Sequence, residues 1–122
     1  MNGNNALSEI GYLVVRVTTA LGAIPLENAA VTIRGNESSN ETVRYSLSTN
    51  SDGHTERIAL PTPPKSNSAT PTSEKPYATY SVDVFADGYI PLHLSNVPVF
   101  SSIISIQPAI MIPLIEGENL RR

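Results

Sequence analysis

The sequence has no cysteine and no tryptophan, and only 16% of its 122 residues are charged. Without cysteine, disulfide bonds, thiolate metal sites and a cysteine nucleophile are all excluded. The formal net charge is only -3, so neither a nucleic acid nor an anionic membrane surface is an expected partner.

Long apolar runs are also missing. No run approaches the roughly 20 residues that cross a bilayer, and the first residues, MNGNNALSEIGYL, lack the basic start and apolar segment of a signal peptide. We therefore expect a soluble protein without membrane insertion, synthesised in the cytoplasm without classical export, and the sequence leaves its final compartment open.

Length and composition favour a single domain. A chain of 122 residues buries roughly two-thirds of its unfolded surface, which is enough for a core of its own. We predict a flexible, Asn-rich lead-in over residues 1–10, one domain over residues 11–115 and a polar tail over residues 116–122.

Apolar and polar residues alternate with a period of two along most of the domain. In the first such segment, residues 12–19, Leu13, Val15 and Val17 form one apolar face. Similar alternation marks segments 29–35, 43–49, 58–60, 80–86, 90–95, 104–107 and 110–114. No segment has a sustained period of 3.6 residues, so helix should be minor. The pattern predicts an all-β fold, an antiparallel Greek-key β-sandwich of about seven to nine strands, immunoglobulin- or transthyretin-like.

Two local expectations follow from this pattern. The turn sequence NSDGHT predicts a hairpin between segments 43–49 and 58–60, because Asp-Gly turns join paired strands. Alternation also places Tyr45 and Tyr80 on core-facing sides. The C-terminal run FSSIISIQPAIMIPLI is rich in isoleucine, which we assign mainly to the core, with an interface as the alternative.

A Pro-rich tract, LPTPPKSNSATPTSEKPY, separates two predicted strands. It offers almost nothing to bury, so we predict an extended or mobile loop within the domain. Structureless loops of this length are uncommon and are often functional. The candidate partner-contact residues are therefore Lys65, Ser66, Thr70, Lys75 and Tyr77.

The sequence shows no catalytic machinery. Its two histidines, His54 and His93, have no acidic or histidine partner at metal-ligand spacing and are interpreted as surface residues. Asp83 and Asp87 are interpreted as a strand residue and a turn residue, and no Gly-x-Ser-x-Gly elbow is present. We expect no catalytic residue, no metal site and no cofactor.

Aromatic side chains are the remaining candidates for recognition. With no tryptophan, a sugar-stacking platform would need tyrosine or phenylalanine rings. Tyr77, Phe85 and Phe100 are the rings that we expect to be exposed, and Phe85 and Phe100 are the candidate exposed aromatics outside the Pro-rich loop.

Three stretches together resemble a known family: NAAVTI, then STNSDGHTERIALPTPP, then PYATYSVDVFADGYIPLHLSNVPVF followed by SIQPAIMIPL. They are similar to the carboxypeptidase regulatory-like domain, a transthyretin-type β-sandwich, in the form found in spore cortex-lytic enzymes and peptidoglycan-binding proteins of spore-forming bacteria. The resemblance runs from about Gly11 to Leu114, and its most specific parts are LPTPP, PYATY, ADGY and NVPVF. It implies a non-catalytic domain with a supporting or recognition role at peptidoglycan, in the spore or cell envelope.

Three hypotheses for function remain. The first is a non-enzymatic accessory or binding module whose partner is peptidoglycan or a wall-associated protein. The second is a structural subunit of a larger assembly, phage-like or at the cell surface, that associates through sheet edges. The third is an unrecognised carbohydrate-active enzyme, which no residue or motif of the sequence supports. The sequence leaves the ligand and the oligomeric state open.

Overall fold

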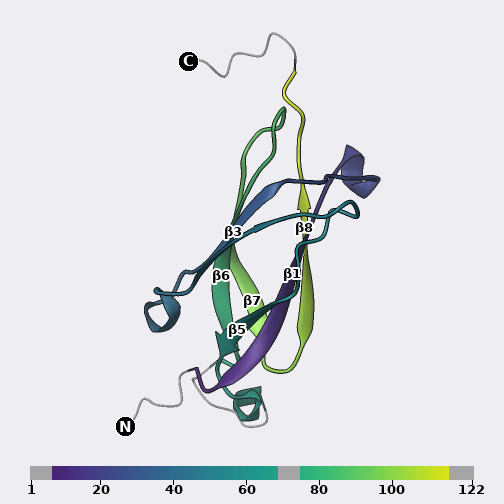
Figure 1. The fold of residues 1–122 in the computed structure, drawn as a ribbon. Coiled ribbons are helices and arrows are strands. Elements are labelled where there is room, and N and C mark those ends of the chain that lie inside the picture. The colour runs from purple at the N-terminus through teal and green to yellow at the C-terminus, as the bar shows by residue number, and fades with distance from the viewer. Residues whose placement is uncertain (1–6, 69–74, 116–122) are drawn as a thin grey trace.

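Two four-stranded sheets pack face to face around a shared core (Figure 1). The structure is a computed structural model that describes residues 7–68 and 75–115. Within these residues it contains eight strands and three short 3-10 turns, which confirms the all-β sandwich. The strands are β1 (Glu9–Thr19), β2 (Ile24–Pro25), β3 (Ala30–Gly35), β4 (Arg44–Ser48), β5 (Ile58–Thr62), β6 (Tyr77–Phe85), β7 (Leu92–Phe100) and β8 (Ile104–Ile110), and the turns are η1 (Ala20–Gly22), η2 (Ser38–Asn40) and η3 (Lys65–Ser68).

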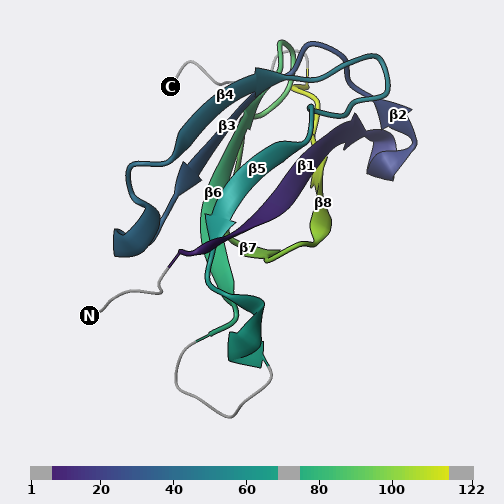
Figure 2. The same cartoon turned by 60° about the horizontal axis from the view of Figure 1, so that its bottom comes forward.

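The first sheet, called sheet A, contains β2, β1, β5 and β8. Strand β1 lies between its neighbours, with β8 along one side and β5 and β2 along the other (Figure 2). The pairing of β1 with β8 is parallel, from Tyr12 opposite Ile104 to Thr18 opposite Ile110, and so departs from the antiparallel expectation. The second sheet, sheet B, is antiparallel in the order β4-β3-β6-β7.

The core is built from the apolar faces that alternation predicts for β1, β3 and β6. Leu13, Val15 and Val17 are fully buried, as is Tyr80, which confirms its core assignment. The Tyr80 hydroxyl donates to the carbonyl oxygen of Pro61 at 2.6 Å and so joins sheet B to sheet A. Burial raises the pKa of this hydroxyl to about 12, because the phenolate would lose its hydration.

The predicted hairpin between segments 43–49 and 58–60 is wrong. A turn does form, since the Gly53 N–H donates to the Asn50 carbonyl at 2.8 Å. However, β4 pairs with β3 in sheet B, whereas β5 pairs with β1 in sheet A. The turn sequence therefore belongs to a crossing between sheets.

Buried threonines explain how the chain can cross there. The Thr49 hydroxyl accepts a hydrogen bond from the Ala29 N–H at 2.9 Å and donates to the Leu26 carbonyl at 2.6 Å. The Thr55 hydroxyl accepts from the Val15 N–H at 3.0 Å. These side chains satisfy backbone groups that no strand partner reaches, because a buried polar group left unpaired is costly.

Tyr45 is 39% exposed, so its core assignment is wrong. It lies on β4, which is the edge strand of sheet B and pairs only with β3 among the described strands. Strand β4 is exposed along most of its length, so its alternation did not mark a buried face.

The isoleucines of β8 face solvent, so their assignment to the core is also wrong. The inward positions of this strand are Ser105, Gln107 and Ala109, because these residues lie opposite the core residues of β1 and share their side of the sheet. The exposed isoleucines of this C-terminal region are Ile103, Ile104, Ile106, Ile110, Ile112 and Ile115.

The Pro-rich tract starts inside a strand and continues into a turn. Pro61 and Thr62 belong to β5, and residues 65–68 form η3 where an extended or mobile loop was expected. The Lys65 N–H donates to the Glu9 carboxylate at 2.9 Å, and the Ser101 hydroxyl donates to the same carboxylate at 2.5 Å. Both hydrogen bonds lower the pKa of Glu9, and the bond from Ser101 has the larger effect.

Candidate functional site

A cleft of about 640 Å³ opens where the chain returns from the Pro-rich tract into β6. Its walls come from the start of β6, the second half of β7 and the segment that leads into η2. The lining residues are Glu37, Lys75, Tyr77, Thr79, Asn96, Pro98 and Phe100.

An aromatic pair forms one wall of the cleft. Tyr77 and Phe100 are directly opposite each other in the β6–β7 register, and their ring centroids lie 5.3 Å apart at an interplanar angle of 47°. The Lys75 ammonium lies 5.6 Å from the centroid of the Tyr77 ring. This spacing allows a cation–π attraction, which favours the cation over the ring face.

The position of Phe100 depends on a glycine in the other sheet. A side-chain carbon at Gly11 would lie only 2.2 Å from the Phe100 carbonyl oxygen, so only glycine lets β1 approach β7 this closely. The core of the sandwich therefore supports the aromatic wall from behind.

A charged pair closes the other side. Lys75 and Glu37 form an ion pair and hydrogen bond. Partial burial raises the pKa of Glu37, but hydrogen bonds from Lys75 and Thr79 outweigh this effect and leave its pKa below the ordinary value. Glu37 is therefore ionised at neutral pH and holds the Lys75 ammonium at the rim.

Glu37 is itself placed by a buried amide. The side chain of Asn40 accepts from the Glu37 N–H at 2.9 Å and donates to the Thr79 carbonyl at 3.0 Å. Asn40 is almost completely buried, and its bond to Thr79 is shielded from water, so the two bonds keep the segment before η2 against β6.

Amide and hydroxyl groups supply the polar floor. The Thr79 hydroxyl lies 2.6 Å from the side-chain amide of Asn36, and that amide lies 3.2 Å from the side-chain amide of Asn96. Asn96 has a positive φ of 59°, and the β6–β7 register shifts between Tyr80 and Val82. Such an irregularity re-aims side chains, and here the Asn96 amide lines the cleft.

The cleft combines apolar ring faces with amide donors and acceptors and one ion pair. This set can bind a ligand that has both apolar C–H faces and amide, hydroxyl or carboxylate groups. Its lining residues include no histidine, so no imidazole base lies beside the hydroxyl groups of Thr79 and Tyr77.

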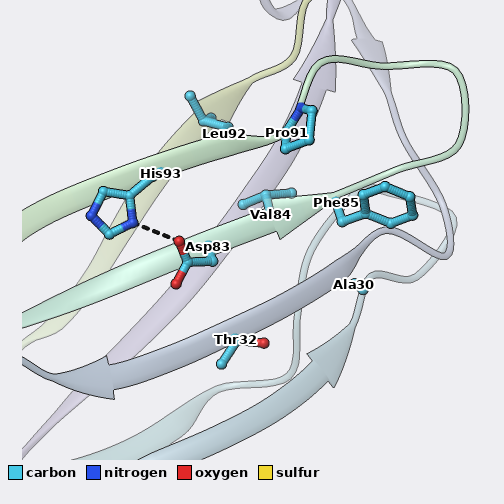
Figure 3. A pocket seen from close by; sticks show the side chains of 8 residues that line it. All are labelled: Ala30, Thr32, Asp83, Val84, Phe85, Pro91, Leu92 and His93. Carbon is cyan, nitrogen blue, oxygen red and sulfur yellow. Dashed lines mark hydrogen bonds and ion pairs between the residues drawn. The ribbon is translucent and has the colours of Figure 1, made fainter. Parts of the chain in front are cut away.

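A second, smaller hollow of about 230 Å³ lies on the outer face of sheet B (Figure 3). His93 Nδ1 lies 2.5 Å from one oxygen of Asp83, and Arg34 donates to the other oxygen at 2.8 Å. The hydrogen bond with His93, followed by that from Arg34, holds the pKa of Asp83 below its usual range. Among the described residues no hydroxyl is hydrogen-bonded to His93, so the cluster is a cross-strand ion pair between Arg34 and Asp83 with a hydrogen bond between Asp83 and His93, on a solvated face.

The structure distributes the predicted site residues over three places. Lys75, Tyr77 and Phe100 come together in the cleft. Lys65 and Ser66 lie apart from it in η3, and Thr70 lies outside the described residues. Phe85, which is 54% exposed, lines the hollow on sheet B (Figure 3).

Sequence reasoning missed the polar half of the cleft and the partner of His93. Counting outward from the Asp87-Gly88 turn would have placed Asp83 opposite His93, as the register shows. The same count would have placed Tyr77 within one residue of Phe100, because the bulge shifts the register. Glu37 carried no comparable signal, since it belongs to a segment far from Lys75 in the sequence.

No protein-family model and no curated protein matches the chain. Solved structures of similar fold are the Bacillus anthracis TIE protein (TM-score 0.60, 15% identity), catechol 1,2-dioxygenase from Acinetobacter sp. ADP1 (0.62, 15%) and GBS52, the minor pilin of Streptococcus agalactiae (0.58, 14%). The matches cover 87%, 99% and 95% of this chain, respectively. They share its β-sandwich fold.

At these identities the likeness concerns the fold alone. The chain spans 17% of the TIE protein, 58% of the dioxygenase and 50% of the pilin. Among the described residues, no group of three or more His, Cys, Asp or Glu side chains is placed to hold a metal ion. No helix within the described ranges is long and apolar enough to span a membrane.

Proposed function

We propose that this chain is a non-catalytic binding module that contacts its partner through the aromatic cleft. The observation that carries the proposal is the convergence of Tyr77, Phe100 and Lys75 with the Asn96 amide. Recognition sites commonly combine aromatic surface with a few oriented polar groups, and this cleft has both.

The proposed partner is peptidoglycan or a wall-associated protein, in the spore or cell envelope. Support comes from the family resemblance of the strands and loop that line the cleft, PYATY and NVPVF. It also comes from chemistry, because wall polymers present sugar C–H faces beside amide and carboxylate groups. The Tyr77 and Phe100 rings suit the C–H faces, and Asn96 and Lys75 suit the amides and carboxylates.

Sedimentation with insoluble peptidoglycan tests this proposal. We expect the wild-type protein to co-sediment, and a Tyr77→Ala/Phe100→Ala variant to lose at least about tenfold in affinity, because aromatic anchors dominate such contacts. The matched control is Phe85→Ala, which removes an exposed ring from the hollow on sheet B. No release of soluble muropeptides is expected during the incubation.

Two results would overturn the proposal. One is a wild-type protein that shows no affinity for peptidoglycan or for wall-associated proteins. The other is binding that Phe85→Ala weakens as much as the double substitution does. Circular dichroism of each variant separates lost binding from lost folding.

A second candidate function is a structural subunit of a larger assembly. The specific observation in its favour is the row of exposed isoleucines along β8, an edge strand of sheet A. Contiguous apolar surface of this kind is typical of protein interfaces. Self-association of the purified chain tests it.

A further inference from the structure

The outer face of sheet A is apolar along β8 and the adjoining first half of β1. Ile104, Ile106 and Ile110 on β8 are 50%, 60% and 44% exposed, and Tyr12 and Val14 lie beside the first two of them on β1. We call these five residues the isoleucine strip. In a two-sheet sandwich this outward side is ordinarily polar, because it faces water.

The core does not require these isoleucines. The inward residues of β8 are Ser105, Gln107 and Ala109, and only the small Ala109 is apolar. The larger apolar side chains of β8 therefore point outward. The strip has the composition of a covered face.

Covering by strand addition at the edge is disfavoured. The Ile103 carbonyl accepts from the Tyr12 N–H, and the Met111 N–H donates to the Thr18 carbonyl, so backbone groups of odd-numbered β8 residues point to β1. Those of the even-numbered residues point to the free edge. Pro108 is one of them, and it has no N–H to offer an added strand.

The parts of this chain that the structure does not describe are not suited to cover the strip. They read MNGNNA, ATPTSE and EGENLRR, and Met1 and Leu120 are their only large apolar residues. A covering surface must therefore come from another folded unit.

The absence of charged side chains from β8 limits which surface can cover the strip. Residues 98–115 contain no charged side chain, so a partner that placed a charged face on the β8 isoleucines would bury its charges there without compensation. The outer face of sheet B carries Arg34, Asp83 and His93 and is unsuitable for this reason. Among the described surfaces, the uncharged apolar face that fits the strip is the strip itself.

We propose that the isoleucine strip packs against the strip of a second copy of this chain, with a two-fold axis running along β8. An isologous interface uses the same patch on both copies. Because this axis runs along β8, each β8 isoleucine meets its own counterpart. The inference rests on the second candidate function above and names the surface and the partner.

The positions of the two arginines near the strip are compatible with a two-fold axis along β8. Arg16 lies on β1, and Arg57, which lies 5.2 Å from the Tyr12 ring, precedes β5, so both are on the side of the strip away from the free edge. A two-fold axis along β8 moves the arginines of the two copies to opposite rims. Their guanidinium groups can then stay in water while the isoleucines are covered.

Sedimentation velocity over a wide concentration range tests the proposal. We expect a wild-type dimer, and a dimer weakened about a hundredfold or more by Ile104→Ser/Ile106→Ser/Ile110→Ser. The matched controls are Phe85→Ser and Leu21→Ser, which change exposed apolar residues outside the strip and should leave the dimer intact.

A charge swap tests the axis itself. Because Ile106 faces Ile106 of the second copy, Ile106→Lys alone and Ile106→Glu alone should each be monomeric. A mixture of the two variants should form a heterodimer that high salt weakens.

The outcomes separate this inference from the functions proposed above. A wild-type monomer at every concentration overturns both the inference and the assembly function, and leaves wall binding through the cleft untouched. An oligomer that the triple substitution does not weaken overturns the strip alone, and the assembly function then stands on another surface. Monomeric charge variants without rescue in the mixture overturn the two-fold axis along β8.

Discussion

The two outer faces of the sandwich differ in composition, although the two sheets share one core. On sheet B, Asp83 binds both Arg34 and His93 across neighbouring strands, and the surroundings are rich in serine and threonine. On sheet A, isoleucine side chains occupy the corresponding outward positions of β8. The outer face of sheet B therefore carries charged groups around Asp83, whereas the outer face of sheet A is apolar along β8.

Alternation of apolar and polar residues with a period of two identifies a strand, but it does not show which side of the strand is buried. Strands β6 and β8 both alternate, yet the apolar side of β6 faces the core and that of β8 faces outward. Pairing with β1 decides the matter for β8, because Val15 and Gln107 are partners and must lie on one side.

The largest expected effect comes from comparing the two sides of sheet A. Leu13→Ala should lower the free energy of unfolding by about 2–5 kcal/mol, because Leu13 is fully buried. Ile106→Ala should lower it by about 0.5 kcal/mol or less, because the side chain is mostly exposed. Urea denaturation at low protein concentration, where association does not contribute, measures both. Equal losses would mean that the strip belongs to the core of a single chain.

A smaller effect is expected where the sheets are joined by a hydrogen bond. Tyr80→Phe should cost about 1 kcal/mol of unfolding free energy, since the partly buried Pro61 carbonyl then loses its donor. Tyr45→Phe, at the exposed edge of sheet B, is the matched control and should change little. Thermal or urea unfolding of both variants provides the measurement.

The same hydroxyl also predicts an alkaline pH dependence. The pKa of Tyr80 is raised to about 12 in the folded protein, above the value of about 10 for an unfolded tyrosine. Its contribution to stability is therefore complete below pH 10 and is lost as the pH rises toward 12. Tyr80→Phe should remove this part of the pH dependence, and an unchanged alkaline profile would contradict the assignment.

The smallest effect is expected on the outer face of sheet B. The pKa of Asp83 is lowered, mainly by the hydrogen bond with His93 and also by Arg34. Its contribution is present above the unfolded pKa of about 4 and is lost as the pH falls through the lower folded value. Asp83→Asn should therefore cost at most about 1 kcal/mol at neutral pH, since all three groups are partly exposed.

Acid titration of stability at low and high salt tests this last expectation. The difference between wild type and Asp83→Asn should shrink at high salt and should disappear in strong acid. A difference that survives both conditions would show that Asp83 acts through packing and not through charge. Sheet A offers no comparable ion pair on the described part of its outer face.

Much of the fold could be predicted from local pattern. Leu13, Val15 and Val17 marked a buried face, and Asp87-Gly88 marked the turn between β6 and β7. The sheet to which β5 belongs could not be predicted, because the threonines that allow the crossing act through partners distant in sequence.

The candidate site could be predicted in part. Lys75 and Tyr77 could be predicted as residues of a long Pro-rich loop, and Phe100 as an exposed ring. The β6–β7 register brings Tyr77 and Phe100 together, and Lys75 lies over the Tyr77 ring. Glu37 and Asn40 could not be chosen, because their roles arise from tertiary contacts with Lys75 and Thr79. Ion pairs and buried amides between distant segments leave no periodic signal in a single sequence.

The parallel pairing of β1 with β8 also governs the order in which the chain can fold. Sheet A is complete only when β8 has formed, because Tyr12 near the start of the chain pairs with Ile104 near its end. The strands of sheet B, in contrast, all lie between Ala30 and Phe100. During synthesis sheet B can assemble first, while β1 keeps one side without its final neighbour. Such non-local closure slows folding, and a nascent chain that stalls before β8 exposes an open strand edge to aggregation.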